Sequence, residues 1–344
     1  MKYTHIPNTD IKVSKICLGT MTFGNQNTEQ EAYEQMNYAL DEGVNFFDTA
    51  EMYAVPPSAA TQGKTEEYIG NWFAKFGKRN EVVLATKIAG PSRGMDWIRE
   101  DLSFSKASLT DALHTSLQRL QTDYIDLYQL HWPERNVNVF GQRNYIHDAN
   151  EQWQDNFEEV LQVLGGFVKE GKIREVGLSN ETPYGTMKFL EASKKGLPRM
   201  QTVQNSYNLL TRSYEIGMSE VSHRENIGLL AYSPLAFGTL SGKYIKDPKT
   251  VGRVSLFPRY VRYSSEQSTN AISKYLDIAD KFNLSLTQMS LAFVNQQPFV
   301  TSNIIGATTM AQLKENISSI DVNLSSEVLE AINQVHELMP NPAP

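Results

Sequence analysis

The chain has 344 residues, 40% of them hydrophobic, and its 32 Lys and Arg against 39 Asp and Glu give a net charge of −7. No basic cluster stands out, so nucleic acid is not expected as a partner. No apolar run approaches the ~20 residues that would cross a bilayer. Cys17 is the only cysteine, which excludes a disulfide framework and a cysteine metal site, and the polar N-terminus favours a cytoplasmic location.

Short apolar runs alternate with amphipathic segments of helical period, a pattern typical of βαβ units. Nearly all the runs are apolar throughout, as expected of strands covered on both faces. The eight strand candidates are residues 14–19, 44–48, 82–87, 125–131, 173–179, 201–205, 227–233 and 301–306. The eight helix candidates are residues 30–42, 65–77, 105–121, 154–170, 183–196, 211–225, 266–283 and 309–318.

Eight strands and eight helices predict an α/β fold, a (β/α)8 TIM barrel. An open doubly wound sheet is the competing architecture, but the first turn (residues 18–24) lacks the G-x-G-x-x-G pattern. No Gly/Ser-rich, Pro-rich or charged linker divides the chain, and residues 54–64 and 133–152 are interpreted as long loops. We therefore expect one domain over residues 1–344.

Three further segments lie outside the eightfold plan. Residues 3–13 alternate in polarity across Asn8-Thr9-Asp10, which predicts a β-hairpin that plugs the bottom of the barrel. Residues 286–296 and 325–338 predict two extra helices toward the C-terminus. All three are expected to cover core rather than to perform chemistry.

Polar side chains follow three of the apolar strands: Asp48, Lys87 and His131, with Tyr53 five residues beyond Asp48. In a parallel barrel these strand ends converge on the C-terminal face, where catalytic residues lie. The structural alternative for Asp48 and Lys87 alone is a buried ion pair, and Asp48 could also cap a turn.

Tyr53 favours the catalytic interpretation. Lowering a phenol pKa from ~10 to ~7 requires about 4 kcal/mol of bias toward phenolate. One lysine charge ~4 Å away, at an effective dielectric of ~20, supplies about that much. Asp48 would hold Lys87 in place, and His131 would orient a bound carbonyl or share the proton. The sequence therefore predicts a general acid at Tyr53.

Further strand ends carry amides and hydroxyls that suit a carboxamide ligand: Ser179, Asn180, Gln204, Asn205, Tyr232 and Ser233. Tyr232 also offers a flat ring for stacking. The segment 233–243 (SPLAFGTLSGK) combines small residues, two glycines and a lysine, so its backbone N–H groups can approach a phosphate. Gly306-Ala307-Thr308-Thr309 opens a helix and predicts a second anion site, although a glycine turn with a Thr N-cap would look the same. The six His lack zinc-ligand spacing, so no metal is expected.

The chain resembles the aldo-keto reductases over nearly its whole length. The matching segments are LGTMTFG, GVNFFDTAEMY, TEEYIG, VVLATK, DYIDLYQLHWP, GKIREVGLSN, VQNSYNLL, AYSPLAFGTLSGKY and IIGATTMAQLKENI. EMYAVPP, TQGKTE and the terminal PAP are most similar to the bacterial Tas-type members of that family.

This resemblance implies NADPH-dependent reduction of an aldehyde or ketone, or its reverse, by a tetrad of Asp48, Tyr53, Lys87 and His131, with Tyr53 the proton donor. It implies a nicotinamide stacked on Tyr232, with its carboxamide held by Ser179, Asn180 and Gln204. By the same likeness, Arg253 would lie near a 2′-phosphate, and Thr20, Met21 and Asp48 would line the cofactor edge. The pyrophosphate would lie under Ser233, Pro234, Leu235, Ala236, Phe237, Gly238, Thr239, Leu240, Ser241, Gly242 and Lys243. The adenosine end would meet Gly306, Thr308, Gln312, Glu315 and Asn316.

The loops 54–64, 88–104 and 133–152 are long for the family, so the small-molecule carbonyl substrate cannot be transferred from relatives. Gln312 is uncharged, which leaves room for NADH. A cofactor-sensing regulatory protein similar to the potassium-channel beta subunits is the alternative function. An aldolase with Lys87 as Schiff base is a third, less consistent with Tyr53 and the phosphate segments. Both a monomer and a homo-oligomer fit the sequence.

Overall fold

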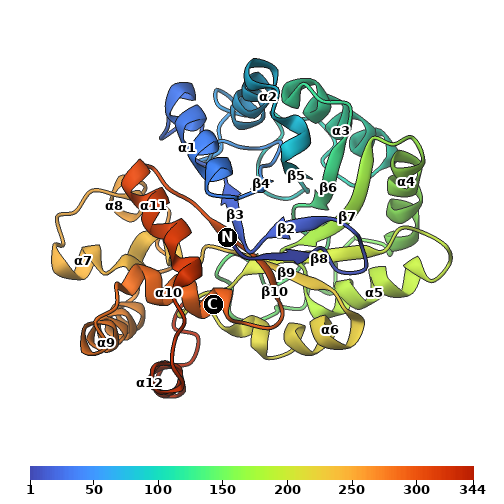
Figure 1. Cartoon of the computed structure of the whole chain (residues 1–344). Helices are drawn as coiled ribbons and strands as arrows, with labels where there is room; N and C mark the ends of the chain where they lie inside the picture. Colours follow the sequence, from blue (N-terminus) through green and yellow to red (C-terminus); the bar gives the residue numbers. More distant parts are fainter.

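The computed structural model describes all 344 residues, Met1–Pro344. Its centre is a closed barrel of eight parallel strands (Figure 1). The strands run in the order β10-β3-β4-β5-β6-β7-β8-β9 around the ring. Their bounds are β3 Ile16–Gly19, β4 Phe46–Asp48, β5 Val83–Ile88, β6 Ile125–Leu130, β7 Ile173–Ser179, β8 Met200–Ser206, β9 Gly228–Tyr232 and β10 Val300–Ile305. The TIM-barrel prediction is confirmed.

A ring of helices surrounds the barrel (Figure 1). Those that alternate with the strands are α1 Glu29–Asp41, α2 Lys64–Phe76, α3 Lys106–Leu120, α4 Phe157–Lys169, α5 Pro183–Ser193, α6 Met218–Glu225, α9 Glu266–Lys281 and α11 Met310–Ser318. Side-chain N-caps fix where several begin, because each satisfies an N–H that the helix leaves free. These caps are Thr28, Ser105, Ser265, Ser285, Thr309 and Ser325.

The predicted hairpin is present as β1 (Tyr3–His5) paired antiparallel with β2 (Lys12–Ser14). Its apolar side chains Ile6, Ile11 and Val13 pack against the interior layer of the barrel, which includes Phe46 and Leu127. The hairpin therefore closes one end of the barrel, and Figure 1 shows it crossing that end. The opposite end, where the strands finish, is the end that carries the polar residues.

The extra helices are α10 (Leu286–Asn295) and α12 (Ser326–Leu338), both as expected. Two short helices in the segment after β9, α7 (Lys243–Lys246) and α8 (Arg253–Leu256), were not predicted because each is a single turn. No helix has the length and apolar character to span a membrane.

The helix predicted over residues 211–225 is wrong in its first half, because α6 begins only at Met218. The backbone before Met218 is hydrogen-bonded to the C-terminal tail instead. The Arg212 N–H donates to Asn341 Oδ1 (2.6 Å), and the Ala343 N–H donates to the Leu210 carbonyl (3.1 Å). Hydrogen bonds to a segment more than a hundred residues away cannot be read from local periodicity. The division of the chain into a single domain stays a prediction.

Candidate active site

Asp48, Lys87 and His131 lie at or just beyond neighbouring strand ends, on the side of the barrel opposite the hairpin. Asp48 closes β4 and pairs in register with Gly19 and Ala85 on the flanking strands. Lys87 lies on β5, level with Gln129 of β6, and His131 follows β6 directly. All three side chains are buried. Parallel register thus brings together residues far apart in the sequence.

An ion pair forms the floor of this site. Lys87 Nζ donates to Asp48 Oδ2 (2.7 Å) and to the Thr49 carbonyl (2.7 Å). The other carboxylate oxygen, Asp48 Oδ1, accepts from Gln204 Nε2 (2.8 Å) and Gln129 Nε2 (3.3 Å). Lys87 is completely inaccessible to solvent. Burial opposes the lysine charge, but Asp48 and Tyr53 outweigh burial and raise the pKa of Lys87 above its usual value. The ammonium therefore stays charged.

Tyr53 lies against this pair. Lys87 Nζ is 5.0 Å from the centroid of the Tyr53 ring, and the ring packs edge-on against His131 with 5.8 Å between centroids. Burial raises the pKa of Tyr53 above 10.0, and the Lys87 charge opposes this rise without cancelling it. The expected lowering toward ~7 is therefore not what the structure gives. Burial is the largest cause, and the Asp48 charge adds to it because it disfavours a phenolate.

His131 completes the group as a neutral imidazole. Burial lowers the pKa of His131 well below 6.5, and the nearby Lys87 charge lowers it further. Nδ1 of His131 is buried and has no hydrogen-bond partner. An unpaired buried polar atom is costly, so a ligand that satisfied it would be favoured here.

Amide side chains connect His131 to the ring of Tyr232. Asn180 Nδ2 donates to the His131 carbonyl (2.9 Å) and to Ser179 Oγ (3.1 Å), while Asn180 Oδ1 accepts from the Tyr232 hydroxyl (2.7 Å). Ser179 Oγ donates to the Gln204 carbonyl (2.9 Å). Gln204 Nε2 is already bonded to Asp48, so only its oxygen remains for a carboxamide ligand. Sequence reasoning did not identify Gln129, although its inward-facing position two residues before His131 in a strand was a usable signal.

The segment after β9 forms a tight loop on the same side. Residues Ala236–Ser241 make a 3₁₀ helix whose Ala236 and Phe237 have left-handed φ of 48° and 58°. Lys243 opens α7, and Arg253 opens α8. The two cations lie close enough that Arg253 contributes to lowering the pKa of Lys243, after burial, and no carboxylate is paired with either. Two neighbouring unpaired cations suit an anionic ligand.

A cavity of about 390 Å³ extends from this loop toward α11. Lys243, Gln312 and Glu315 are among the residues that line it. Gln312 Oε1 accepts from the Thr308 N–H (2.9 Å), and Asn316 Nδ2 donates to the Gly306 carbonyl (3.0 Å). Of the residues predicted for the phosphate and adenosine parts of a cofactor, Ser241, Lys243, Gln312 and Glu315 line this cavity.

Thr20 and Met21 lie between the two parts of the site. Thr20 Oγ1 donates to the Asp48 carbonyl (2.8 Å), and Met21 Sδ is 3.9 Å from Arg253 Nη1. Arg253 is also close enough to Tyr53 to interact with it electrostatically. The role of Arg253 at a 2′-phosphate stays a prediction.

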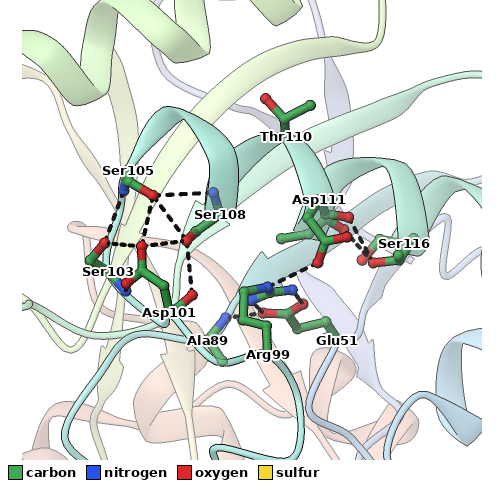
Figure 2. Close-up of polar contacts among 12 residues, drawn as sticks. Glu51, Ala89, Arg99, Asp101, Ser103, Ser105, Ser108, Thr110, Asp111 and Ser116 are labelled. Atoms are coloured by element: carbon green, nitrogen blue, oxygen red, sulfur yellow. Dashed lines mark hydrogen bonds and ion pairs between the residues drawn. The ribbon is translucent and has the colours of Figure 1, made fainter.

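A second buried ion pair, not foreseen from the sequence, supports the wall of the site (Figure 2). Glu51, three residues after Asp48, is fully buried, and both its oxygens accept from Arg99 in the loop between β5 and α3. Glu51 Oε1 also accepts from the Ala89 N–H (2.6 Å). Burial raises the pKa of Glu51, and Arg99 opposes that rise. The pair links the segment between Asp48 and Tyr53 to the long loop 88–104.

The family model described as "Aldo/keto reductase family" matches residues 15–337. The chain belongs to the aldo/keto reductase family. It is similar to Protein tas of Escherichia coli (strain K12), with 49% identity covering 100% of both chains. It is 33% identical to the "Uncharacterized oxidoreductase YrpG" of Bacillus subtilis, over 97% of this chain and 96% of that one. A "Probable voltage-gated potassium channel subunit beta" of Arabidopsis thaliana is 28% identical over 99% of this chain and 98% of its own.

Membership of this family makes the protein an oxidoreductase with a TIM-barrel fold, of a family that acts on small carbonyl compounds. The resemblance found in the sequence, to the family and to its Tas-type members, is confirmed. The identity of the cofactor, the role of each site residue and the substrate go beyond this assignment.

Proposed function

We propose that this chain is an NADPH-dependent reductase that converts an aldehyde or ketone to an alcohol, with Tyr53 as proton donor. The observation that carries the proposal is the contact of the Tyr53 ring with both the Lys87–Asp48 ion pair and a neutral His131. In this proposal, Tyr53 would act as proton donor beside a fixed positive charge and an uncharged imidazole, at the open end of the barrel.

The residues present fit a nicotinamide dinucleotide. Unpaired cations at Lys243 and Arg253 suit its phosphates, and the cavity bounded by Lys243, Gln312 and Glu315 has room for its adenosine end. Tyr232 would stack against the nicotinamide, and Asn180 and the oxygen of Gln204 would meet its carboxamide. When bound, this cofactor supplies the hydride.

The protein's own contribution is the proton and the charge around it. The raised pKa of Tyr53 keeps its phenol protonated at neutral pH, so it donates a hydrogen bond to the carbonyl oxygen. As that oxygen gains negative charge, the proton moves to it, and the Lys87 ammonium stabilises the phenolate that remains. Neutral His131 donates a second hydrogen bond to the same oxygen and orients it. A positioned acid of this kind contributes roughly 10²–10⁴-fold to rate.

NADPH is the preferred form in this proposal because the 2′-phosphate adds two negative charges near an unpaired lysine. Gln312 adds no charge there, so NADH would bind more weakly rather than be excluded.

The second candidate is a cofactor-binding regulatory protein. The likeness to a protein named as a probable potassium channel subunit beta, over nearly the whole of both chains, supports it. The two candidates differ in what Tyr53 has to do. A reductase needs its proton for turnover, whereas a sensor needs cofactor binding and not rapid turnover.

The deciding experiment follows NADPH oxidation by the purified protein with a panel of aldehydes, ketones and quinones. The reductase predicts saturable turnover with part of the panel. NADPH binding without turnover on any member would contradict the reductase and favour the regulatory protein.

A further inference from the structure

Arg93, at the mouth of the site, forms no ion pair with a carboxylate. It lies in the loop 88–104, exposed to solvent, and its guanidinium stacks over the Phe140 ring at 4.4 Å. The buried carboxylates on this side of the barrel already have cationic partners: Asp48 has Lys87, Glu51 has Arg99 and Glu181 has Arg135. Although the residue is exposed, nearby protein atoms partly shield its guanidinium from water and lower its pKa, and no carboxylate opposes this effect.

The loop that carries Arg93 is anchored on both sides of it. Before Arg93, the Ala89 N–H donates to Glu51, and the Pro91 carbonyl accepts from Trp132 Nε1 (2.9 Å). After it, Arg99 pairs with Glu51, as Figure 2 shows. Asp101 then accepts from three serine hydroxyls at the start of α3, also drawn in Figure 2: Ser103, Ser105 and Ser108. The position of Arg93 is therefore set by buried contacts on either side of a short tip.

A chain of ring contacts leads from Arg93 into the site. Phe140, under Arg93, meets Trp132 edge-on with 6.2 Å between centroids. Trp132 is 4.9 Å from the ring of His131, which in turn packs on Tyr53 at 5.8 Å. Arg93 is also close enough to Tyr232 to interact with it electrostatically. The Arg93 guanidinium is thus connected to the ring of the proposed proton donor through three contacting rings, Phe140, Trp132 and His131.

We propose that the natural substrate is an aldehyde or ketone that also carries a carboxylate or another anionic group, and that Arg93 binds this group. The inference rests on the proposed reductase function and adds its substrate class. Stacking on Phe140 occupies the face of the guanidinium and leaves its N–H edge free, which is the edge that binds a carboxylate in a bidentate manner.

The test compares two aldehydes of the same shape and different charge, 4-carboxybenzaldehyde and 4-formylbenzamide, together with their 3-substituted isomers. With NADPH, the natural protein should show a higher kcat/KM for the carboxylates, mainly through a lower KM, because the charge is bound equally in ground and transition states. The preference should fall as salt is raised.

Arg93→Met keeps the apolar stem over Phe140 and removes the charge. It should lower kcat/KM for the carboxylates by roughly tenfold, the size expected for one hydrogen bond to a charged group, and leave the amides unchanged. Arg93→Lys should restore most of the preference. Arg143→Met is the matched control, because Arg143 lies in the facing loop with its Nη atoms bonded to the Asn341 and Pro342 carbonyls.

Equal kcat/KM for both aldehydes in the natural protein would overturn the anionic substrate and leave the reductase intact. So would an equal loss on both aldehydes in Arg93→Met, which would make Arg93 a structural contact. If Arg143→Met lost the same preference for carboxylates, the preference would come from the overall positive charge of the two loops rather than from binding by Arg93. Turnover of neither aldehyde class would overturn the reductase and this inference with it.

Discussion

The phenol of Tyr53, the proposed proton donor, is held in its protonated form. Burial outweighs the lysine charge and raises the pKa of Tyr53, and the Asp48 carboxylate, 2.7 Å from Lys87 Nζ, raises it further. The pair therefore does not produce a resting phenolate. Its effect is expected in the transition state, when the proton has begun to leave and the ammonium lies beside the developing charge.

Breaking the ion pair from one side should be costly for stability. Asp48→Asn leaves the Lys87 ammonium buried without a counter-charge, and we expect a loss of about 3–5 kcal/mol in the free energy of unfolding. Asp48→Asn combined with Lys87→Met should recover a large part of that loss. Urea denaturation of the single and double variants measures both. If the loss of unfolding free energy in the double variant equalled the sum of the losses in the two single variants, Asp48 and Lys87 would not stabilise each other.

His131 should make the protein sensitive to mild acid. Its pKa is depressed in the folded state, so the unfolded chain binds a proton that the folded chain does not. Its contribution to stability is full above the unfolded pKa of about 6.5 and declines as pH falls below that value. His131→Gln should therefore flatten the part of the stability–pH curve just below pH ~6.5, measured by urea denaturation. An unchanged curve would contradict a neutral, buried His131.

At the scale of elements, the loop between β5 and α3 depends on one buried carboxylate. Glu51 accepts from Arg99 and Ala89, whereas Asp111, the other partner of Arg99 (3.1 Å), is exposed. Both carboxylates can be replaced by isosteric amides, so Glu51→Gln and Asp111→Asn form a matched pair.

Glu51→Gln should raise KM for the carbonyl substrate several-fold and lower the melting temperature, because it leaves Arg99 partly buried without its main partner. Asp111→Asn should change little, as expected of an exposed ion pair. Steady-state kinetics and thermal denaturation of both variants provide the comparison. Equal effects would show that the burial of Glu51 has no special role in the loop.

Elements with their own periodicity could be predicted, and elements defined by distant contacts could not. The eight strands appear in the sequence as apolar runs, and parallel register then places Asp48, Lys87 and His131 together. Residues 211–217 do not form the predicted helix, because their backbone is hydrogen-bonded to the C-terminal tail. The Glu51–Arg99 pair joins residues 48 positions apart and has no local pattern. Gln129 was overlooked because it lies inside an otherwise apolar strand.

At the scale of the whole molecule, closure of the barrel gathers three kinds of segment on one face: strand ends, the loop after β9 and the start of α11. The hairpin β1–β2 closes the other end with apolar side chains, so we expect the chemistry on the side where the strands end. In the proposed complex the adenosine part would lie in the cavity beside Lys243 and the carbonyl beside Tyr53, so that different residues would serve affinity and chemistry.

That separation predicts a cofactor-selective variant. Lys243→Ala should weaken NADPH binding by roughly tenfold and NADH binding much less, because only NADPH carries the 2′-phosphate. Lys249→Ala, an exposed lysine of the same segment, is the control and should leave both affinities unchanged. Titration calorimetry with each cofactor measures the difference. Equal losses for the two cofactors in Lys243→Ala would argue against recognition of the 2′-phosphate by this lysine.

The most direct test of the proposed function is Tyr53→Phe, which removes one hydroxyl from a partly buried ring and keeps its packing against Lys87 and His131. NADPH affinity and single-turnover reduction of an aldehyde that the natural protein reduces should be measured on the same preparation. We predict that the affinity stays nearly unchanged and the rate of reduction falls by roughly 10²–10⁴-fold. An unchanged rate would contradict Tyr53 as the proton donor.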